Sequence, residues 1–264
     1  MSEFSEIENI SGEADYSRQR EMWSPDFLIS QQEVEIFLTN PLFAQNVVDA
    51  ITKTDETHET DEKKYHGREF GFIGFFSDGK FEPICTPLFE GDEHSINLML
   101  QSSNFMDRNP DVDSEIILAF HTHPARRSLG EGKLIDAIFQ RKPSSKAQIF
   151  QNFFSTSDLK IFKHLALDES LSLILALGTV EEGKRGLGKV VLITPQSFEA
   201  LVSMDPKNLV KRIMDYKLTA GKDYLDAYRE AGLNVAVLPV NLDNQPHINP
   251  SDIKLASQIL TTRT

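Results

Sequence analysis

Residues 116–124 read Ile-Ile-Leu-Ala-Phe-His-Thr-His-Pro and predict a buried strand with a chemically unusual end. Successive side chains of a strand point to opposite faces, so His121 and His123 share one face and Thr122 points to the other. Pro124 cannot donate a hydrogen bond to a neighbouring strand, and it therefore places the two imidazoles where the strand stops. The junction of a strand with a loop is a common place for a binding or catalytic site.

The rest of the chain mixes strand-like and helix-like segments. Runs rich in β-branched and aromatic residues, bounded by turn residues, predict strands at residues 69–76, 80–87, 171–179, 189–194 and 233–240. Helical periodicity of apolar residues covers residues 34–51, 94–106, 159–166, 208–231 and 251–260. This mixture predicts an α/β or α+β fold, in which a mixed central sheet is flanked by helices.

Short local signals mark where several of these elements begin and end. Ser30-Gln-Gln-Glu33 is typical of a capping box at a helix start, and Asn40-Pro41 interrupts the helix that follows. Asp78-Gly79 predicts a tight hairpin turn, because glycine tolerates the positive φ that such a turn requires. The charged run at residues 54–64 is typical of a solvated loop, and Ser251 is the expected cap of the last helix.

A second polar motif, Ser155-Thr-Ser-Asp158, precedes the apolar helical pattern of residues 159–166. This spacing is typical of a capping box, in which the serine and the acidic side chain only satisfy backbone groups. Residues three apart at a helix start also lie on one side of the helix, so Ser155 and Asp158 can both face one ion. The spacing by itself leaves both interpretations open.

The histidine pair offers part of the donor set of a metal site. Two neutral imidazoles suit zinc, and a carboxylate is a usual third ligand in a catalytic site that keeps one position open. His121 and His123 are therefore candidate ligands of a Zn²⁺ ion, and the third ligand stays open at this point. The alternative is that the two histidines only form local hydrogen bonds, and their spacing alone does not separate the two interpretations.

These two blocks, His121-Thr-His-Pro124 and Ser155-x-x-Asp158, together with an upstream glutamate, resemble the MPN+ or JAMM family of metalloproteases. The order of elements is also similar to that family: helix, glutamate-bearing strand, hairpin, helix, His-x-His-Pro strand, Ser-x-x-Asp helix and paired strands. The resemblance covers residues 26–195. It implies a Mov34/JAB core of the cytidine-deaminase-like type, with extensions at both ends.

The resemblance also implies a mechanism and a class of substrate. His121, His123 and Asp158 would hold Zn²⁺ and leave a fourth position open for water. Glu69 would be the general base and acid, and Ser155 would donate a hydrogen bond to the oxyanion of the tetrahedral intermediate. The implied reaction is hydrolysis of a peptide or isopeptide bond in a protein or peptide, and the tail of a ubiquitin-like protein is one such substrate.

The surroundings of the glutamate depart from the family pattern. Gly71 follows Glu69 by two positions, one position earlier than in the family's Glu-x-x-Gly. The other interpretation of Glu69 is therefore an exposed carboxylate at the strand end. Glu62 and Glu82 are less suitable candidates for the same role.

The spacer between the two motifs departs from the family pattern as well. It is much longer here than in the family, so we expect an insertion at about residues 125–154. Residues 125–152 contain six basic side chains and two acidic ones, a net charge of +4 in a protein whose net charge is −13. A basic, glycine-containing loop beside a metal is typical of a lid or a substrate-docking flap, and a solvated surface excursion is the alternative.

Two other functions fit part of the pattern. A non-catalytic MPN-type scaffold or interaction module has the same fold, typically without the metal ligands. An amidohydrolase barrel or a phosphoesterase also uses a His-x-His block, but too few residues follow that block here to build the eight βα units of a barrel. Metal content is the observation that separates a scaffold from an enzyme.

Composition limits the partners, the compartment and the domain organisation that we expect. The net charge of −13 and the pI near 5.0 argue against broad binding of nucleic acids or anionic membranes, which requires a basic face. The single cysteine, Cys85, excludes an internal disulfide, and we expect a cytoplasmic protein without a membrane span. We expect a disordered acidic tail at residues 1–24, a metalloprotease-like domain at 25–195 and a C-terminal α/β extension at 196–264.

Overall fold

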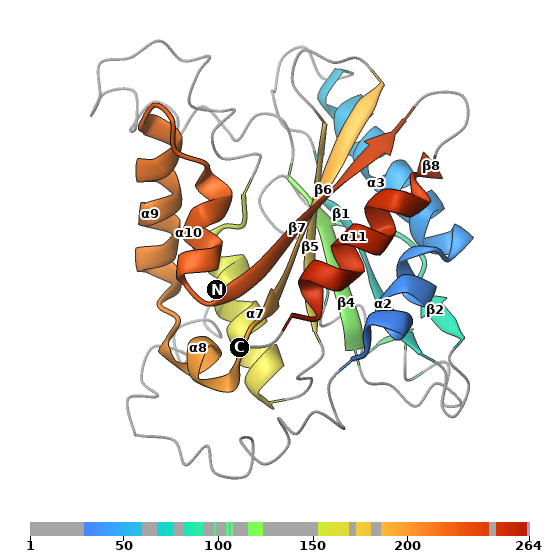
Figure 1. Cartoon of the computed structure of the whole chain (residues 1–264). Helices are drawn as coiled ribbons and strands as arrows, with labels where there is room; N and C mark the ends of the chain where they lie inside the picture. The colour runs from blue at the N-terminus through green and yellow to red at the C-terminus, as the bar shows by residue number, and fades with distance from the viewer. Residues whose placement is uncertain are drawn as a thin grey trace.

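The structure of the protein is a computed structural model in which an eight-stranded sheet lies between two groups of helices (Figure 1). It describes residues 29–59, 68–76, 82–91, 98, 104, 105, 107, 116–123, 153–168, 173–180, 186–242 and 247–262. The helices with given bounds are α2 (Gln31–Leu38), α3 (Pro41–Glu59), α7 (Thr156–Asp168), α8 (Phe198–Ser203), α9 (Pro206–Leu218), α10 (Tyr224–Glu230) and α11 (Pro250–Leu260). The strands are β1 (Phe70–Phe76), β2 (Pro83–Cys85), β3 (Phe89–Glu90), β4 (Ile116–Thr122), β5 (Ile174–Val180), β6 (Leu187–Pro195), β7 (Leu233–Asn241) and β8 (His247–Ile248).

The sheet is mixed and open. Its described strands follow the order β2-β1-β4-β5-β6-β7-β8, and β3 pairs with β1 outside this path. β4 and β5 are parallel, whereas the other paired strands are antiparallel. A barrel of eight parallel strands is therefore excluded for the described part of the chain. The predicted architecture, a mixed central sheet flanked by helices, is confirmed.

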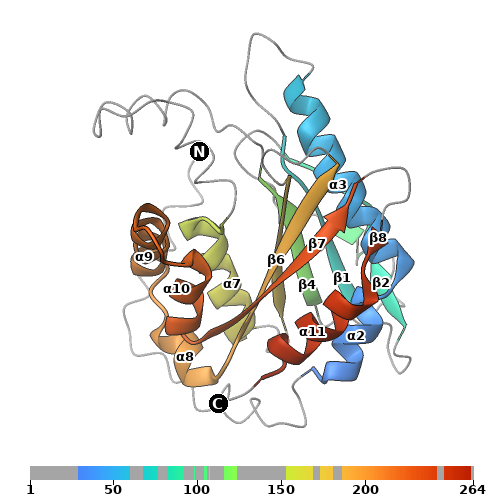
Figure 2. The ribbon, with the colours of Figure 1, turned by 45° about the horizontal axis from the view of Figure 1, so that its top comes forward.

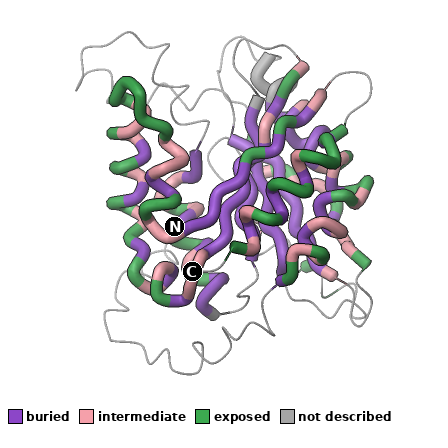
Figure 3. The backbone as a smooth tube through the Cα atoms, viewed as in Figure 1, coloured by how far each residue is buried: buried purple, intermediate pink, exposed green. Residues whose placement is uncertain are grey.

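Helices cover both faces of the sheet (Figures 1 and 2). We call the face under α2, α3 and α11 the α3 face, and the face under α7, α8, α9 and α10 the α7 face. Each face has its own buried apolar core, and the central strands are buried along most of their length (Figure 3). Because side chains alternate along a strand, β4 supplies both cores: Leu118 and Phe120 on the α3 face, and Ala119 on the α7 face.

The described residues of the C-terminal part, 196–242 and 247–262, continue the same sheet and both helical layers. β7 pairs with β6 from Leu187 opposite Asn241 to Pro195 opposite Leu233. α11 packs against α2 on the α3 face, and the hydroxyl of Ser257 donates to the Glu35 carboxylate there at 3.0 Å. α9 and α10 pack against each other on the α7 face. The predicted extension is therefore part of the same sheet and helical layers that carry β4 and α7.

Several local predictions are confirmed. Ser30 caps α2 in a reciprocal box with Glu33. The helical run is interrupted between Leu38, where α2 ends, and Pro41, where α3 begins. β1 and β2 pair antiparallel, as expected for the hairpin around residues 78–79. The strands predicted before and after the Ser-x-x-Asp helix are β4 and the β5–β6 pair.

Other boundaries differ from the predictions for local reasons. The predicted helix over 208–231 is two helices, because Gly221 adopts a positive φ of 80° and a new helix begins after Asp223. Asn249, not Ser251, caps α11, since Pro250 occupies the first helical turn. The predicted charged loop is wrong in its first part, because α3 continues through Glu59. β2 is shorter than predicted, and α8 was not predicted.

Some predictions fall on residues outside the described part of the chain. These are the acidic tail 1–24, the turn at 78–79, most of the helix at 94–106, Pro124 and residues 125–152 of the insertion. Within the described residues, no helix combines the length and the apolar character that crossing a membrane requires.

Candidate metal centre

The end of β4 places two histidines on the α7 face of the sheet. His121 and His123 are two residues apart, so both side chains point to that face. Thr122 points to the α3 face and is fully buried. Its hydroxyl accepts a hydrogen bond from Phe70 N–H at 3.0 Å and lies 2.5 Å from the hydroxyl of Thr54 on α3. The two imidazoles therefore project from a strand end that is held to both β1 and α3.

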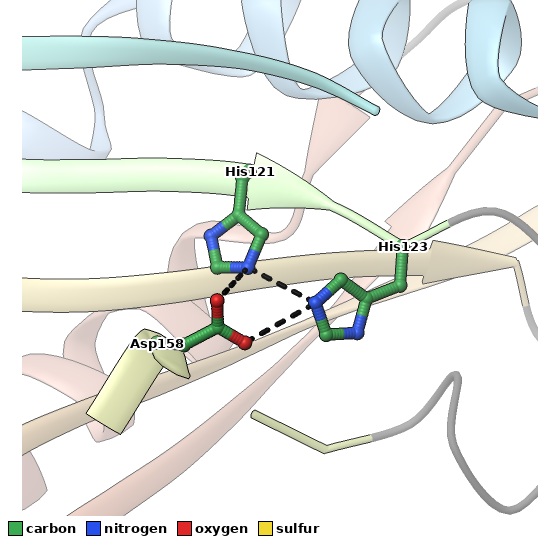
Figure 4. A group of neighbouring side chains, drawn as sticks. All are labelled: His121, His123 and Asp158. Carbon is green, nitrogen blue, oxygen red and sulfur yellow. Dashed lines mark hydrogen bonds and ion pairs between the residues drawn. The ribbon is translucent and has the colours of Figure 1, made fainter. Parts of the chain in front are cut away.

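The start of α7 supplies a third polar side chain. Ser155 N–H donates to Asp158 Oδ2 at 2.6 Å, and Asp158 N–H donates to Ser155 Oγ at 3.2 Å. These reciprocal hydrogen bonds satisfy backbone donors that a helix start leaves without intrahelical partners. They also fix the Asp158 carboxylate on the side of α7 that faces the end of β4 (Figure 4). The capping interpretation and the ion-facing interpretation of this spacing thus apply to the same pair of residues.

His121, His123 and Asp158 bring their ligand atoms together despite the long spacer between the motifs (Figure 4). His121 Nε2 lies 3.2 Å from His123 Nε2 and 3.5 Å from Asp158 Oδ1. His123 Nε2 lies 3.3 Å from Asp158 Oδ2. Atoms that bind one tetrahedral zinc ion at about 2.0–2.2 Å lie roughly 3.3–3.6 Å from one another. The observed separations match that spacing, so this group can hold a metal ion.

The group is shielded from solvent. His121 and His123 expose 4% and 5% of their surface, and the Asp158 side chain exposes 18%. Burial by itself would raise the pKa of the Asp158 carboxyl, but the charges and hydrogen bonds of His121 and His123 hold that pKa well below its ordinary value. The carboxylate is therefore ionised at neutral pH and is a suitable partner for a cation at the centre of the group.

The lone pairs of the group also favour a cation. An unprotonated imidazole nitrogen and a carboxylate oxygen both carry lone pairs, so such atoms repel one another at close range unless a proton or a metal ion lies between them. A proton joins only two of these atoms, whereas a metal ion meets all three. His123 Nδ1 is buried and has no hydrogen-bond partner among the described residues. Within the described part of the chain no bond at Nδ1 fixes the tautomer of His123, and its Nε2 is the atom directed into the group.

Glu69 lies on the same face of the sheet as the two histidines. In the β1–β4 ladder Gly71 lies opposite His121. Glu69 is two residues before Gly71, so the alternation of side chains directs it to the same face as Gly71 and His121. Residues opposite each other in a sheet share a face. Only 4% of the surface of Glu69 is exposed, so the alternative of an exposed strand-end carboxylate does not hold.

The other candidate glutamates are not placed with this group. Glu82 directly precedes Pro83, which pairs with Phe76 at the end of β1 that is remote from Glu69. Glu62 lies outside the described residues. Glu69 is therefore the described candidate base at the end of β1 that pairs with the histidine-bearing end of β4.

An aromatic cluster behind the group was not found by sequence reasoning. Phe154, which precedes Ser155, packs near His121 with a ring-centroid separation of 6.3 Å. Tyr228 of α10 packs edge-on against Phe154, and its hydroxyl accepts a hydrogen bond from Phe154 N–H at 3.2 Å. Burial raises the pKa of Tyr228 well above its ordinary value, so the phenol stays neutral. Only helical periodicity marks Tyr228 in the sequence, and that signal does not reveal which segment the side chain supports.

Comparisons of the chain with family models, with curated proteins and with solved structures find no match. The resemblance to the MPN+ family therefore stays a prediction that depends on the motif residues. The metal-binding capacity of the group depends on its own geometry and donor atoms.

Proposed function

We propose that the protein is a zinc-dependent hydrolase of peptide or isopeptide bonds in a protein or peptide substrate. The observation that carries this proposal is the convergence of His121, His123 and Asp158 at the end of β4. Two imidazoles and one carboxylate are a common ligand set of catalytic zinc, in which the remaining position is open to water or substrate. Structural zinc sites are typically closed by four protein ligands, and the described residues offer three here.

The proposed reaction uses three kinds of group. A zinc ion held by the two histidines and Asp158 would lower the pKa of a water molecule and polarise the scissile carbonyl. Glu69, buried on the same face, takes a proton from the attacking water and delivers it to the leaving amine. Ser155 Oγ accepts from Asp158 N–H and keeps its own hydroxyl proton for the oxyanion of the tetrahedral intermediate.

The arrangement of the motifs supports placing this protein with the MPN+ or JAMM metalloproteases. The His-x-His pair and the Ser-x-x-Asp pair lie far apart in the sequence and yet meet in space. A mixed sheet with helices on both faces is compatible with a core of that type. The chemistry of the family extends the proposal to an isopeptidase, for which the tail of a ubiquitin-like protein is one substrate.

A non-catalytic scaffold of the same fold is the second candidate. The shifted glycine after Glu69 favours it, because that departure lies beside the proposed base. The metal group argues against it, since a scaffold has no need to hold buried lone pairs 3.2–3.5 Å apart. Stoichiometric zinc in the purified protein would favour the enzyme, and its absence the scaffold.

Two variants test the proposed function through metal content and turnover. Glu69→Gln should retain about one zinc ion per chain and lose about 10²–10⁴-fold in turnover, because the base is removed and the ligands are kept. His121→Ala should lose both the zinc and the turnover. Elemental analysis measures the metal, and mass spectrometry of a set of peptide-linked and isopeptide-linked substrates measures hydrolysis. Full activity of Glu69→Gln would show that the base is assigned wrongly.

A further inference from the structure

The end of β1 that follows Glu69 is held to β4 by a side chain. The register of the two strands ends at Gly71 opposite His121. At the next residue, Phe70 N–H donates to the hydroxyl oxygen of Thr122 at 3.0 Å, and the same oxygen lies 3.2 Å from the carbonyl oxygen of Phe70. The Thr122 hydroxyl therefore takes the place of a strand partner for both backbone groups of Phe70.

Thr54 of α3 adds a second hydroxyl, and we call Thr54 and Thr122 together the threonine clamp. Thr54 Oγ1 lies 2.5 Å from Thr122 Oγ1 and 2.8 Å from the carbonyl oxygen of Ala50. Each hydroxyl has one proton, so the hydrogen bonds run either from Thr122 through Thr54 to Ala50, or from Thr54 through Thr122 to the Phe70 carbonyl. In both directions a lone pair of Thr122 Oγ1 remains for Phe70 N–H. The bond between β1 and Thr122 is therefore independent of the direction of the chain.

The threonine clamp lies where water does not reach it. Thr122 exposes none of its surface, and Thr54 exposes 4%. A buried N–H that loses its acceptor gains no bond to water in exchange, so the conformation that keeps the bond is strongly favoured. On the other edge of the same segment, Gly91 N–H donates to the carbonyl oxygen of Glu69 at 2.8 Å. The backbone at Glu69 is thus held toward β4 by the clamp and from the side of β3 by Gly91.

The histidine-bearing end of β4 has a further support that does not involve the clamp. The parallel ladder of β4 with β5 continues through His121 opposite Leu177 and Thr122 opposite Gly178. Loss of the Thr122 hydroxyl alone would leave these pairs in place, because they are set by the backbone of β4. The same loss would release β1 at the residue next to Glu69. We therefore expect the clamp to control where Glu69 lies relative to the histidines, and not where the histidines themselves lie.

We propose that the threonine clamp positions Glu69 against the metal group, and that Thr122 is the residue through which it acts. This inference rests on the proposed function, in which Glu69 is the base. Thr122 is a positioning residue and not a catalytic one, because its hydroxyl lies on the α3 face with Thr54, whereas the metal group lies on the α7 face. A misplacement of about 1 Å can cost about 10²-fold in rate. The residue between the two ligand histidines therefore sets the place of the base.

Thr122→Val tests this role, because valine keeps the shape of threonine and removes the hydroxyl. In the metal-free protein, amide hydrogen exchange at Phe70 should become about tenfold faster, the effect of losing about one hydrogen bond. The zinc-loaded variant should keep about one zinc ion per chain and lose about 10²-fold in kcat, with KM changed by less than about threefold. Thr122→Ser should restore both the exchange rate and kcat. Thr54→Val is the matched control, because it removes a buried hydroxyl and leaves Thr122 as the acceptor for Phe70, so it should change neither.

Exchange at Phe70 that is unchanged in Thr122→Val, or equally fast in Thr54→Val, would overturn the clamp. Full turnover of Thr122→Val, with Glu69→Gln inactive, would overturn the positioning role and leave the hydrolase in place. If Thr122→Val does not fold, exchange in the wild type decides: Phe70 N–H should be as slow as Phe72 N–H, whose residue is paired with Phe120 in the ladder. Exchange at Phe70 about tenfold faster than at Phe72 would then overturn the clamp.

A measurement without turnover separates failure of the clamp from failure of the proposed function. If the wild type hydrolyses none of the substrates, the hydrolase fails, and the Co²⁺-loaded protein then tests the clamp. The paramagnetic shift of the Glu69 carboxyl carbon, assigned with Glu69→Gln, reports where this side chain lies relative to the metal. A shift that is altered in Thr122→Val and restored in Thr122→Ser would support the positioning role. Equal shifts in all three proteins, or no uptake of Co²⁺, would overturn it.

Discussion

Helices α2 and α7 begin with the same hydrogen-bonded box on opposite sides of the sheet. At α2, Ser30 N–H donates to Glu33 Oε2 at 2.6 Å, and Glu33 N–H donates to Ser30 Oγ at 3.2 Å. At α7, the corresponding distances between Ser155 and Asp158 are also 2.6 and 3.2 Å. The box of α2 is exposed, whereas the box of α7 is partly buried and its carboxylate faces two histidines.

The difference lies in what surrounds each box. On the α3 face, β4 presents Phe120 to an apolar core and Thr122 to partners that satisfy its hydroxyl. On the α7 face, the same strand presents His121 and His123 toward the carboxylate of Asp158. The reciprocal box therefore supplies a rigid carboxylate in both places, and the neighbouring strand decides whether that carboxylate only caps a helix or also completes a metal group.

Among the substitutions that compare the two boxes, Asp158→Asn should have the largest effect, which is a loss of affinity for zinc. The amide oxygen can still accept from Ser155 N–H, but it lacks the charge that binds a cation. We expect the affinity for zinc to fall, as measured by competition with a chelating dye. Changes to residues that only support the ligands of a metal site lower its affinity by about 10–100-fold, and the loss of a ligand should lower it further. Glu33→Gln makes the same chemical change in the box of α2 and should leave that affinity unchanged. Equal affinities of the two variants would contradict the metal assignment.

Ser155→Ala tests whether this serine does more than cap a helix. Loss of a capping serine costs about 1 kcal/mol in the free energy of unfolding, and denaturant titrations should show this for both Ser155→Ala and Ser30→Ala. Only Ser155→Ala should also lower turnover, by about 10²–10³-fold, which is the effect of removing one oxyanion donor. If the two variants lose equal stability and both keep full turnover, Ser155 is a helix cap alone.

The part of the site that depends on local periodicity could be predicted from the sequence. The alternation of side chains places His121 and His123 on one face, and the capping-box spacing predicts the hydrogen bonds between Ser155 and Asp158. The meeting of these two pairs was a hypothesis of the resemblance and did not follow from either pattern. A long spacer can return the chain to many places, because closing a longer loop adds little entropic cost.

Other features were missed because they depend on backbone conformation or on tertiary packing. The apolar spacing of residues 208–231 is continuous, and only the turn at Gly221 divides it into α9 and α10. The meeting of Lys189 with Lys217 depends on how α9 packs over the sheet, which no local pattern encodes. The same holds for the support that Tyr228 gives to Phe154.

Tyr228→Phe tests whether the C-terminal helices hold the box of α7 in place. The change leaves the buried N–H of Phe154 without its acceptor, so the free energy of unfolding should fall by about 1–3 kcal/mol. Hydrogen exchange at that N–H should also become faster. Tyr216→Phe is the control, because its hydroxyl bonds to the exposed Glu230 and its loss should change stability by less than about 0.5 kcal/mol. Unchanged exchange at Phe154 in Tyr228→Phe would contradict this supporting role.

The smallest expected effect is the change in the free energy of unfolding when Lys217 of the α7 face is replaced, and this change depends on pH. Burial, with the charge of Lys189, lowers the pKa of Lys217 from its ordinary value of 10.5 to about 8. The fold therefore disfavours the charged lysine. Lys217→Met should raise the free energy of unfolding at pH 7 by on the order of 1 kcal/mol, once partial exposure is discounted. Lys254→Met is the control on the α3 side, because Lys254 is exposed on α11 and its loss should change little.

The sign of the pH dependence follows from the direction of the shift. Below about pH 8 Lys217 is charged in both the folded and the unfolded chain, so the gain from Lys217→Met is complete there. Between about pH 8 and 10.5 the folded wild type loses the proton first, and the gain shrinks toward zero. Denaturant unfolding at several values from pH 7 to pH 9.5 measures this decline. If the gain in the free energy of unfolding from Lys217→Met stays constant with pH, or if the variant is less stable at pH 7, the fold does not disfavour the charged lysine. The contrast between the two sides of the sheet would then depend on the metal group alone.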